Sequence, residues 1–193
     1  LGDVYKRQVP KLVVNIAIDQ LRTDYIEAFI PYYSEGGIKK LLRNGAVYSN
    51  AQYMFSPVDR ASSIASISTG TSPSSNGITG FRWLNKNTLI PVNCVDDNSY
   101  EGIFTKEGAS PKNIITTTIN DELKIATEGD AIVYSIALER DAAVIGGGHA
   151  ADGALWFNKD NKCWCSSKYY FKKAPSWLES VSYTHLTLPT SDL

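Results

Sequence analysis

Two runs of apolar, largely β-branched residues dominate the hydrophobic pattern of this chain, at residues 11–18 (KLVVNIAI) and 131–138 (AIVYSIAL). An uninterrupted run of this length is typical of a strand buried on both faces of a parallel sheet. Residues 23–33 and 112–127 instead carry apolar side chains at helical spacing. This alternation predicts an α/β fold in which helices lie on the faces of a mostly parallel sheet.

Shorter elements are expected between these segments. They are helices at residues 38–43 and 62–68, strands at residues 46–55 and 142–145, and a hairpin built from residues 155–158 and 163–170. Residues 62–68 are mostly small, which would let this helix pack very close to a sheet.

The two ends differ from the middle in pattern and composition. Residues 1–8 (LGDVYKRQ) and 181–193 (VSYTHLTLPTSDL) look like translated sequencing-adapter sequence of the kind that flanks metagenomic reading frames. We therefore expect a non-native-looking tail at 1–8, a domain at 9–180 and a second such tail at 181–193. The tails should pack poorly, with Leu186 and Leu188 outside the main core. Native polar tails are the alternative. We expect no signal peptide within the given residues, although one could precede them in the parent protein.

The composition is that of an ordinary globular protein, with 43% hydrophobic and 20% charged residues among 193. The chain contains 19 Lys and Arg residues and 20 Asp and Glu residues, and the basic residues form no continuous run. This balance argues against nucleic acid as a partner. No apolar run reaches the ~18 residues of a transmembrane helix, so none is expected.

Histidine and cysteine are scarce. Two His and three Cys are too few for a site of several imidazoles or for an all-cysteine zinc cluster. Cys163 and Cys165 place both thiols on one face of a strand, which favours packing and is a weak signal for a metal. His149 and Asp152 are spaced like an acid–base or ligand pair, although a single His is more often structural.

Two short motifs contain residue types suited to a site. Asp19 ends the first apolar run, where loops of an α/β sheet bind ligands, and would serve as a metal ligand, a general base or a helix cap. Asp59-Arg60 precedes a helix start at about Ala61, where backbone amides favour an anion and Arg60 could bind phosphate or sulfate in bidentate fashion. An Asp cap beside a solvated Arg is the simpler interpretation. Neither a P-loop nor a G-x-G-x-x-G motif is present.

Three segments taken together resemble the N-terminal half of an alkaline phosphatase superfamily protein. They are KLVVNIAIDQLRTDYI, SPVDRASSIASISTGTSPSSNGITG and SIALERDAAVIGGGHAADGALWF, and the resemblance extends over residues 11–177. It is strongest to phosphate-irrepressible alkaline phosphatases and the type I phosphodiesterase/nucleotide pyrophosphatase group. The resemblance implies a three-layer α/β/α fold, incomplete here, and two zinc ions that activate a Thr or Ser nucleophile against phosphate esters.

The resemblance assigns two residues to family positions in the zinc site. Asp19 matches an Asp that ligates one zinc. Arg60 falls on the nucleophile, whether the chain is aligned on the family's Thr-Gly element or on the Asp-Ser-Ala motif of other alkaline phosphatases. Arginine stays protonated and is no nucleophile. Ser62 or Ser63 could substitute only if the helix register shifted.

Three further positions depart from the family pattern. Phe81 stands where many members carry an Asn that contacts the phosphoryl oxygens. Glu139 and Asp141 stand where phosphate-irrepressible members have Lys and Arg, so positive phosphate clamps have become negative.

The remaining zinc ligands of the family belong to its C-terminal half, which this chain lacks, so we expect an incomplete zinc site and no activity. One hypothesis is a truncated phosphate-ester hydrolase. A second is a pseudoenzyme that uses Arg60 to bind an anionic small molecule or a partner; an unrelated α/β module would make the match accidental. The resemblance implies a periplasmic or cell-envelope location. Asp19 should lie within about one side-chain length of Asp59-Arg60.

Overall fold

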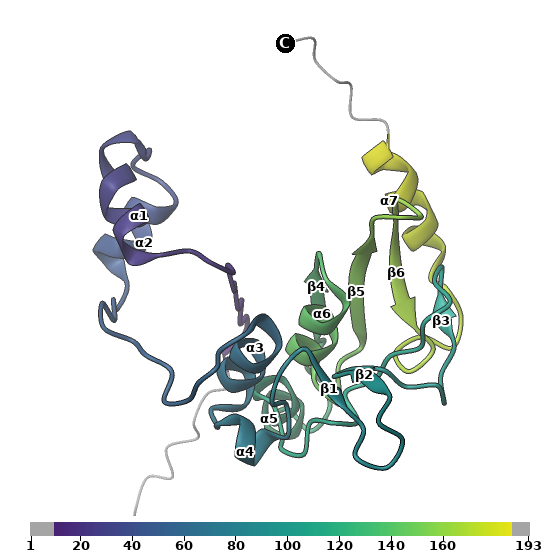
Figure 1. Ribbon diagram of the computed structural model, residues 1–193. Coiled ribbons are helices and arrows are strands. Elements are labelled where there is room, and N and C mark those ends of the chain that lie inside the picture. Colours follow the sequence, from purple (N-terminus) through teal and green to yellow (C-terminus); the bar gives the residue numbers. More distant parts are fainter. Residues whose placement is uncertain (1–9, 187–193) are drawn as a thin grey trace, which may run out of the picture. The chain divides into compact units, whose positions relative to one another are not determined.

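The computed structural model describes residues 10–186, and the side chains of residues 10–182 (Figure 1). These residues form two compact units, a smaller one of Leu12–Ser56 and a larger one that contains Lys11 and the residues from Pro57 onward.

The larger unit is built on a four-stranded sheet in the order β3–β6–β5–β4 (Figure 1). Its strands are β3 (Gly102–Ile103), β4 (Tyr134–Ala137), β5 (Gly153–Asn158) and β6 (Cys163–Ser167). Strands β4 and β5 are parallel, whereas β6 is antiparallel to both of its neighbours. The sheet of the described residues is therefore mixed rather than mostly parallel, because the predicted hairpin, here β5–β6, reverses the chain direction. Strands β1 (Arg82–Leu84) and β2 (Pro91–Asn93) form a separate antiparallel pair.

Five helices of the described residues belong to this unit. They are α3 (Arg60–Thr69), α4 (Pro73–Asn76), α5 (Ile119–Ala126), α6 (Arg140–Gly147) and α7 (Ser176–Leu186). The helix predicted at 112–127 begins only at Ile119, because Thr118 forms a capping box with Asp121 and so fixes the first turn. The strand predicted at 142–145 is wrong, since these residues lie in α6. Helix α6 is buried at three consecutive positions, Ala143, Val144 and Ile145, and a buried helix and a buried strand give the same short apolar run.

The two faces of the sheet are covered by different helices, which gives three layers. Trp156 and Cys165 are cross-strand partners and pack in one core cluster with residues of α3 and α6, including Ala61 and Val144. Leu155, on the opposite face of β5, packs with Leu178 of α7. The small residues of α3 allow a close approach as predicted, but α3 packs against α6 rather than directly against the sheet.

The smaller unit contains helices α1 (Thr23–Phe29) and α2 (Ile38–Asn44), with a 3-10 turn at Ile30–Tyr32. The strands predicted at residues 11–18 and 46–55 are wrong, because the described residues of both segments form no strand. Leu12 and Ile16 are 80% and 73% exposed. A strand needs a backbone partner, and no described strand pairs with the 11–18 run.

Helix α7 crosses the boundary predicted between residues 180 and 181. Ser182 is buried, accepts a hydrogen bond from the Trp164 amide at 3.1 Å and donates one to the Leu178 carbonyl at 2.9 Å. Residues 1–8, Leu188 and the Leu186 side chain lie outside what the structure describes, so the domain boundaries stay predictions. Among the described residues, every helix is too short or too polar to cross a bilayer.

Candidate functional site

The N-terminus of α3 is held by Asp59. Its carboxylate accepts hydrogen bonds from the Ser62 amide at 2.8 Å and the Ser62 hydroxyl at 2.9 Å, while the Asp59 amide donates to that hydroxyl at 3.0 Å. The second carboxylate oxygen accepts from the Phe81 amide at 2.5 Å. Burial alone would raise the pKa of Asp59, but these donors outweigh it and hold the pKa below its ordinary value. The simpler expectation for Asp59, that of a helix cap, is confirmed.

Arg60 is paired with Asp141, at the first turn of α6. The guanidinium donates from Nε and Nη2 to the two carboxylate oxygens at 3.0 and 2.9 Å. The Asp141 side chain is 2% exposed and that of Arg60 is 29% exposed. The Phe81 ring lies on the guanidinium, with 5.5 Å from Cζ to the ring centroid. This geometry is the bidentate contact predicted for Arg60, but the acceptor is a carboxylate of the chain itself.

A pocket of about 530 Å³ lies beside this pair, and Asp141 is among its lining residues. Each acidic side chain that lines it forms an ion pair: Asp96 and Glu107 with Arg140, Glu139 with Lys159, and Asp141 with Arg60. Arg82 and Lys106 line the pocket as well, and neither forms an ion pair with a described residue. Asp96 and Glu107 share the single charge of Arg140, so one carboxylate charge remains against the two charges of Arg82 and Lys106.

The structure brings together four of the positions singled out from the sequence. Phe81, Glu139 and Asp141 line the pocket, and Arg60 forms an ion pair with Asp141. Arg140, Arg82 and Lys106 were missed, because each is one basic residue among many and only the fold places them around a common space.

The hydroxyls of Ser62 and Ser63, named above as possible substitutes for the nucleophile, both form hydrogen bonds within the chain. Ser62 is fully buried and serves the capping box, and the Ser63 hydroxyl donates to the Arg60 carbonyl at 2.9 Å. The thiol of Cys94 is also buried, and burial together with the nearby Asp141 and Asp59 carboxylates raises its pKa to about 12.

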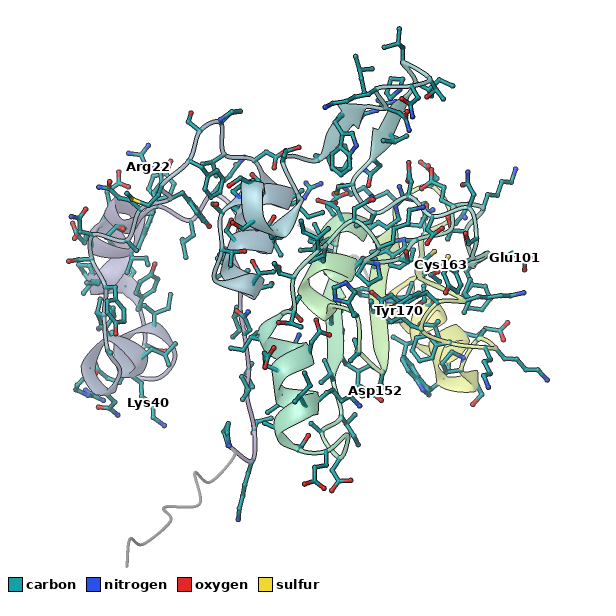
Figure 2. The ribbon with its side chains drawn as sticks, turned by 90° about the horizontal axis from the view of Figure 1, so that it is seen from below. Arg22, Lys40, Glu101, Asp152, Cys163 and Tyr170 are labelled. Atoms are coloured by element: carbon teal, nitrogen blue, oxygen red, sulfur yellow. The ribbon has the colours of Figure 1, made fainter. Side chains whose placement is uncertain are left out.

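His149 and Asp152 are not partners. His149 Nδ1 lies 3.1 Å from a carboxylate oxygen of Asp121, and its Nε2 lies 3.0 Å from the Ile114 carbonyl. Asp152, labelled in Figure 2, pairs with Lys124 at 2.8 Å and accepts from the Val133 amide at 2.7 Å. The acid–base pair suggested by their spacing is therefore replaced by two structural contacts.

The described residues do not fit a two-zinc centre. No three His, Cys, Asp or Glu side chains among them converge as a metal site requires. Asp19 belongs to the smaller unit, so its role as a ligand and its nearness to Arg60 stay predictions.

The sequence matches the family model described as type I phosphodiesterase / nucleotide pyrophosphatase over residues 13–178. The chain therefore belongs to this family of the alkaline phosphatase superfamily, as the motifs had indicated. It is 37% identical over 180 residues to the alkaline phosphatase PhoV of Synechococcus elongatus, covering 92% of this chain and 33% of that relative.

A second relative connects the sequence match to the fold. The alkaline phosphatase PafA of Elizabethkingia meningoseptica is 34% identical over 177 residues, covering 90% of this chain and 32% of the relative. The crystal structure of wild-type PafA superposes with a TM-score of 0.83 at 32% identity, covering 87% of this chain and 33% of that one. The α/β fold predicted for the family is thus confirmed, and the chain spans about a third of the length of these relatives.

Proposed function

We propose that this chain is the N-terminal part of an alkaline phosphatase superfamily member that has lost the nucleophile and binds a small anionic molecule without hydrolysing it. The observation that carries the proposal is the bidentate pair between Arg60 and Asp141. By family resemblance, Arg60 stands at the nucleophile and Asp141 at a position that elsewhere supplies a cation.

The pair explains how two unfavourable replacements can coexist. An aspartate alone in place of a phosphate clamp would be a buried anion, because the Asp141 side chain is only 2% exposed. Together they neutralise each other through two parallel hydrogen bonds. The same pair removes the chemistry, since a guanidinium neither attacks phosphorus nor is deprotonated in proteins.

Among the described residues, neither the Ser62 and Ser63 hydroxyls nor the Cys94 thiol is placed to replace the nucleophile. Ser62 is buried within the cap, and Ser63 is bonded to a backbone carbonyl. Cys94 has a pKa near 12, so little thiolate forms at neutral pH. These three contacts support the absence of turnover in the described part of the site.

Binding of an anion is supported by the pocket beside the pair. Arg82 and Lys106 line it without an ion pair to a described carboxylate, whereas Glu139 is held by Lys159 at 2.9 Å. Arg60 itself is occupied by Asp141, so the anion contact moves from Arg60 to Arg82 and Lys106. The ligand class that fits is a phosphate ester or a similar small anion.

Calorimetric titration with p-nitrophenyl phosphate tests this function, with the released phenolate followed in the same samples. The expected result is binding that weakens by about tenfold or more in Arg82→Ala/Lys106→Ala, without release of product. Lys172→Ala removes a lysine that does not line the pocket and should leave binding unchanged. Equal binding by all three proteins would contradict the proposed pocket.

The location and the metal are proposed on resemblance. For the complete protein, the family resemblance supports a periplasmic or envelope location and zinc dependence. This chain spans about a third of the length of its relatives. Sequencing the parent gene downstream tests the metal: scattered loss of the Asp and His ligands would support a pseudoenzyme, and a complete set would favour a metal-binding member.

A further inference from the structure

Arg140, the first residue of α6, lies between two carboxylates from different segments of the pocket wall. Its Nη2 donates a hydrogen bond to Asp96 at 2.5 Å, and its Nη1 lies 2.9 Å from a carboxylate oxygen of Glu107. All three side chains line the pocket, and Arg140 Nη1 is buried beneath Glu107. Arg140 can therefore contact an anion in the pocket only when one of the two carboxylates moves away.

The two carboxylates differ in how firmly they are held. The second oxygen of Asp96 accepts a hydrogen bond from the Asn93 amide at 2.9 Å, which fixes this side chain beside the end of β2. Glu107 is 69% exposed, and its contact lacks hydrogen-bond geometry, because Arg140 Nη1 forms no hydrogen bond with any described residue. An ion pair that is open to water contributes little to stability. Glu107 is therefore the partner that an incoming anion can replace.

Glu107 follows Lys106 on a loop whose backbone is closely packed. The Asp97 amide donates a hydrogen bond to the Gly108 carbonyl at 3.2 Å. A Cβ atom at Gly108 would collide with the Tyr100 carbonyl, so only glycine fits directly after Glu107. The loop thus presents a cation and an anion side by side in the pocket, and only the Glu107 side chain has to rotate to uncover Arg140.

The charges of the wall leave one positive charge for a ligand. Three of the four carboxylates that line the pocket are each matched by one cation, in the ion pairs Asp96–Arg140, Glu139–Lys159 and Asp141–Arg60. The fourth, Glu107, stands against Arg82 and Lys106, which form no ion pair with a described residue. The net charge of this set is positive by one unit with Glu107 in place, and by two units without its charge.

We propose that Glu107 is an internal competitor of the ligand and adapts the pocket to small oxyanions of single charge. A bound anion takes the place of Glu107 beside Arg140 Nη1 and contacts Arg82 and Lys106. This inference rests on the proposed function, because it concerns the anion that the same pocket binds. Binding involves no covalent step.

Single charge is favoured because attraction and desolvation depend differently on the charge of the ligand. The attraction to the wall grows in proportion to that charge. The cost of taking the anion out of water grows about as its square. A dianion thus gains about twice the attraction of a monoanion at about four times the desolvation cost. With one net positive charge in the wall, the second charge of a dianion is not compensated.

Calorimetric titration at pH 8 with two ligands of nearly the same shape tests this preference. p-Nitrophenyl sulfate carries one negative charge and p-nitrophenyl phosphate carries two, because the second pKa of a phosphate monoester is about 6. The wild-type chain should bind the sulfate about threefold more tightly than the phosphate, or better. Glu107→Gln keeps the size of the side chain and removes its charge. It should strengthen binding of the sulfate about threefold and of the phosphate about tenfold, since the added potential acts on two charges.

Glu101→Gln is the matched control. Glu101, labelled in Figure 2, is 78% exposed, pairs with Lys168 and does not line the pocket, so its replacement changes the charge of the chain equally. Both ligands should bind this variant as they bind the wild-type chain. Because Glu107 is exposed, Glu107→Gln should fold, which circular dichroism verifies.

The possible failures are distinguishable. Tighter binding of the phosphate than of the sulfate by the wild-type chain, or no gain in Glu107→Gln, would overturn this inference and leave the anion pocket in place. An equal gain in Glu101→Gln would also overturn it, because the effect would then come from the overall charge. Failure of both ligands to bind the wild-type chain and Glu107→Gln would contradict the proposed function itself, and this inference with it.

Discussion

The Arg60 guanidinium and the Asp141 carboxylate, 81 positions apart, meet in two parallel hydrogen bonds that join the first turn of α3 to the first turn of α6. The N-terminus of α6 itself favours the Asp141 charge, and the capped start of α3 holds Arg60 in place. The pair thus stabilises the junction between the first turns of these two helices.

Removing Arg60 and removing Asp141 should lower the free energy of unfolding by different amounts. Arg60→Ala leaves a 2% exposed carboxylate without its cation and should lower the free energy of unfolding by about 3 kcal/mol. Asp141→Ala leaves an arginine that can reach water and should lower the free energy of unfolding by about 1–2 kcal/mol. Urea unfolding of both single variants and the double variant measures the coupling, which should leave the double variant more stable than the sum predicts.

Lys159→Ala serves as the control for that cycle, because the Lys159–Glu139 pair is exposed at 73% and 40% and should contribute less than about 0.5 kcal/mol. Purely additive losses at residues 60 and 141 would show that the pair carries no coupling.

Acid should destabilise the larger unit through Asp97. Burial would raise its pKa, but hydrogen bonds from Ser110 and Ser99 and the ion pair with Lys112 lower it to about 2. A lowered native pKa stabilises the fold above the unfolded value near 3.9, and this stability is lost as the pH falls toward 2.

Thermal unfolding between pH 7 and pH 2 measures this loss in the wild-type chain and in Asp97→Asn. At pH 7 the Asp97→Asn variant should be less stable than the wild-type chain by about 1–3 kcal/mol. Between pH 4 and pH 2 its stability should fall by less than that of the wild-type chain. Exposed Asp160→Asn should follow the wild-type curve, and identical curves for all three proteins would rule out Asp97 as the acid-sensitive group.

The packing of α6 against the sheet gives a third prediction. Ile145 is fully buried in the main core, so Ile145→Ala should lower the free energy of unfolding by about 2–5 kcal/mol. Ile125 belongs to α5 and is 64% exposed, so Ile125→Ala should change it by less than about 0.5 kcal/mol. Similar losses in the two variants would mean that the core does not lie where the structure places it.

Local sequence patterns predicted the elements that are fixed by contacts between residues close in sequence. The start of α3 follows from Asp59, which caps the helix two residues before the buried Ala61. The β5–β6 hairpin follows from two strand patterns on either side of a short polar turn. Strand β4 was predicted with bounds that were too wide. Residues 142–145 were misassigned because an apolar run of four carries no period that separates a buried helix from a strand.

The candidate site could be predicted only in part, because its contacts are long-range. Family motifs identified Arg60 and Asp141 separately, but no local pattern shows that a cation and an anion 81 residues apart neutralise each other. The ion pairs of Arg140 with Asp96 and Glu107 were missed for the same reason. The apolar run at 11–18 predicted a strand, yet a strand forms only where a partner strand is present.

Hydrolysis of p-nitrophenyl phosphate by the purified chain with zinc tests whether Arg60 has replaced the nucleophile. We predict no phenolate release above the rate of buffer with zinc, and no gain in Arg60→Thr, because the described residues hold no metal cluster to stabilise the developing charge. Zinc-dependent turnover by the wild-type chain, abolished in Ser62→Ala or Ser63→Ala but retained in Arg60→Ala, would contradict it.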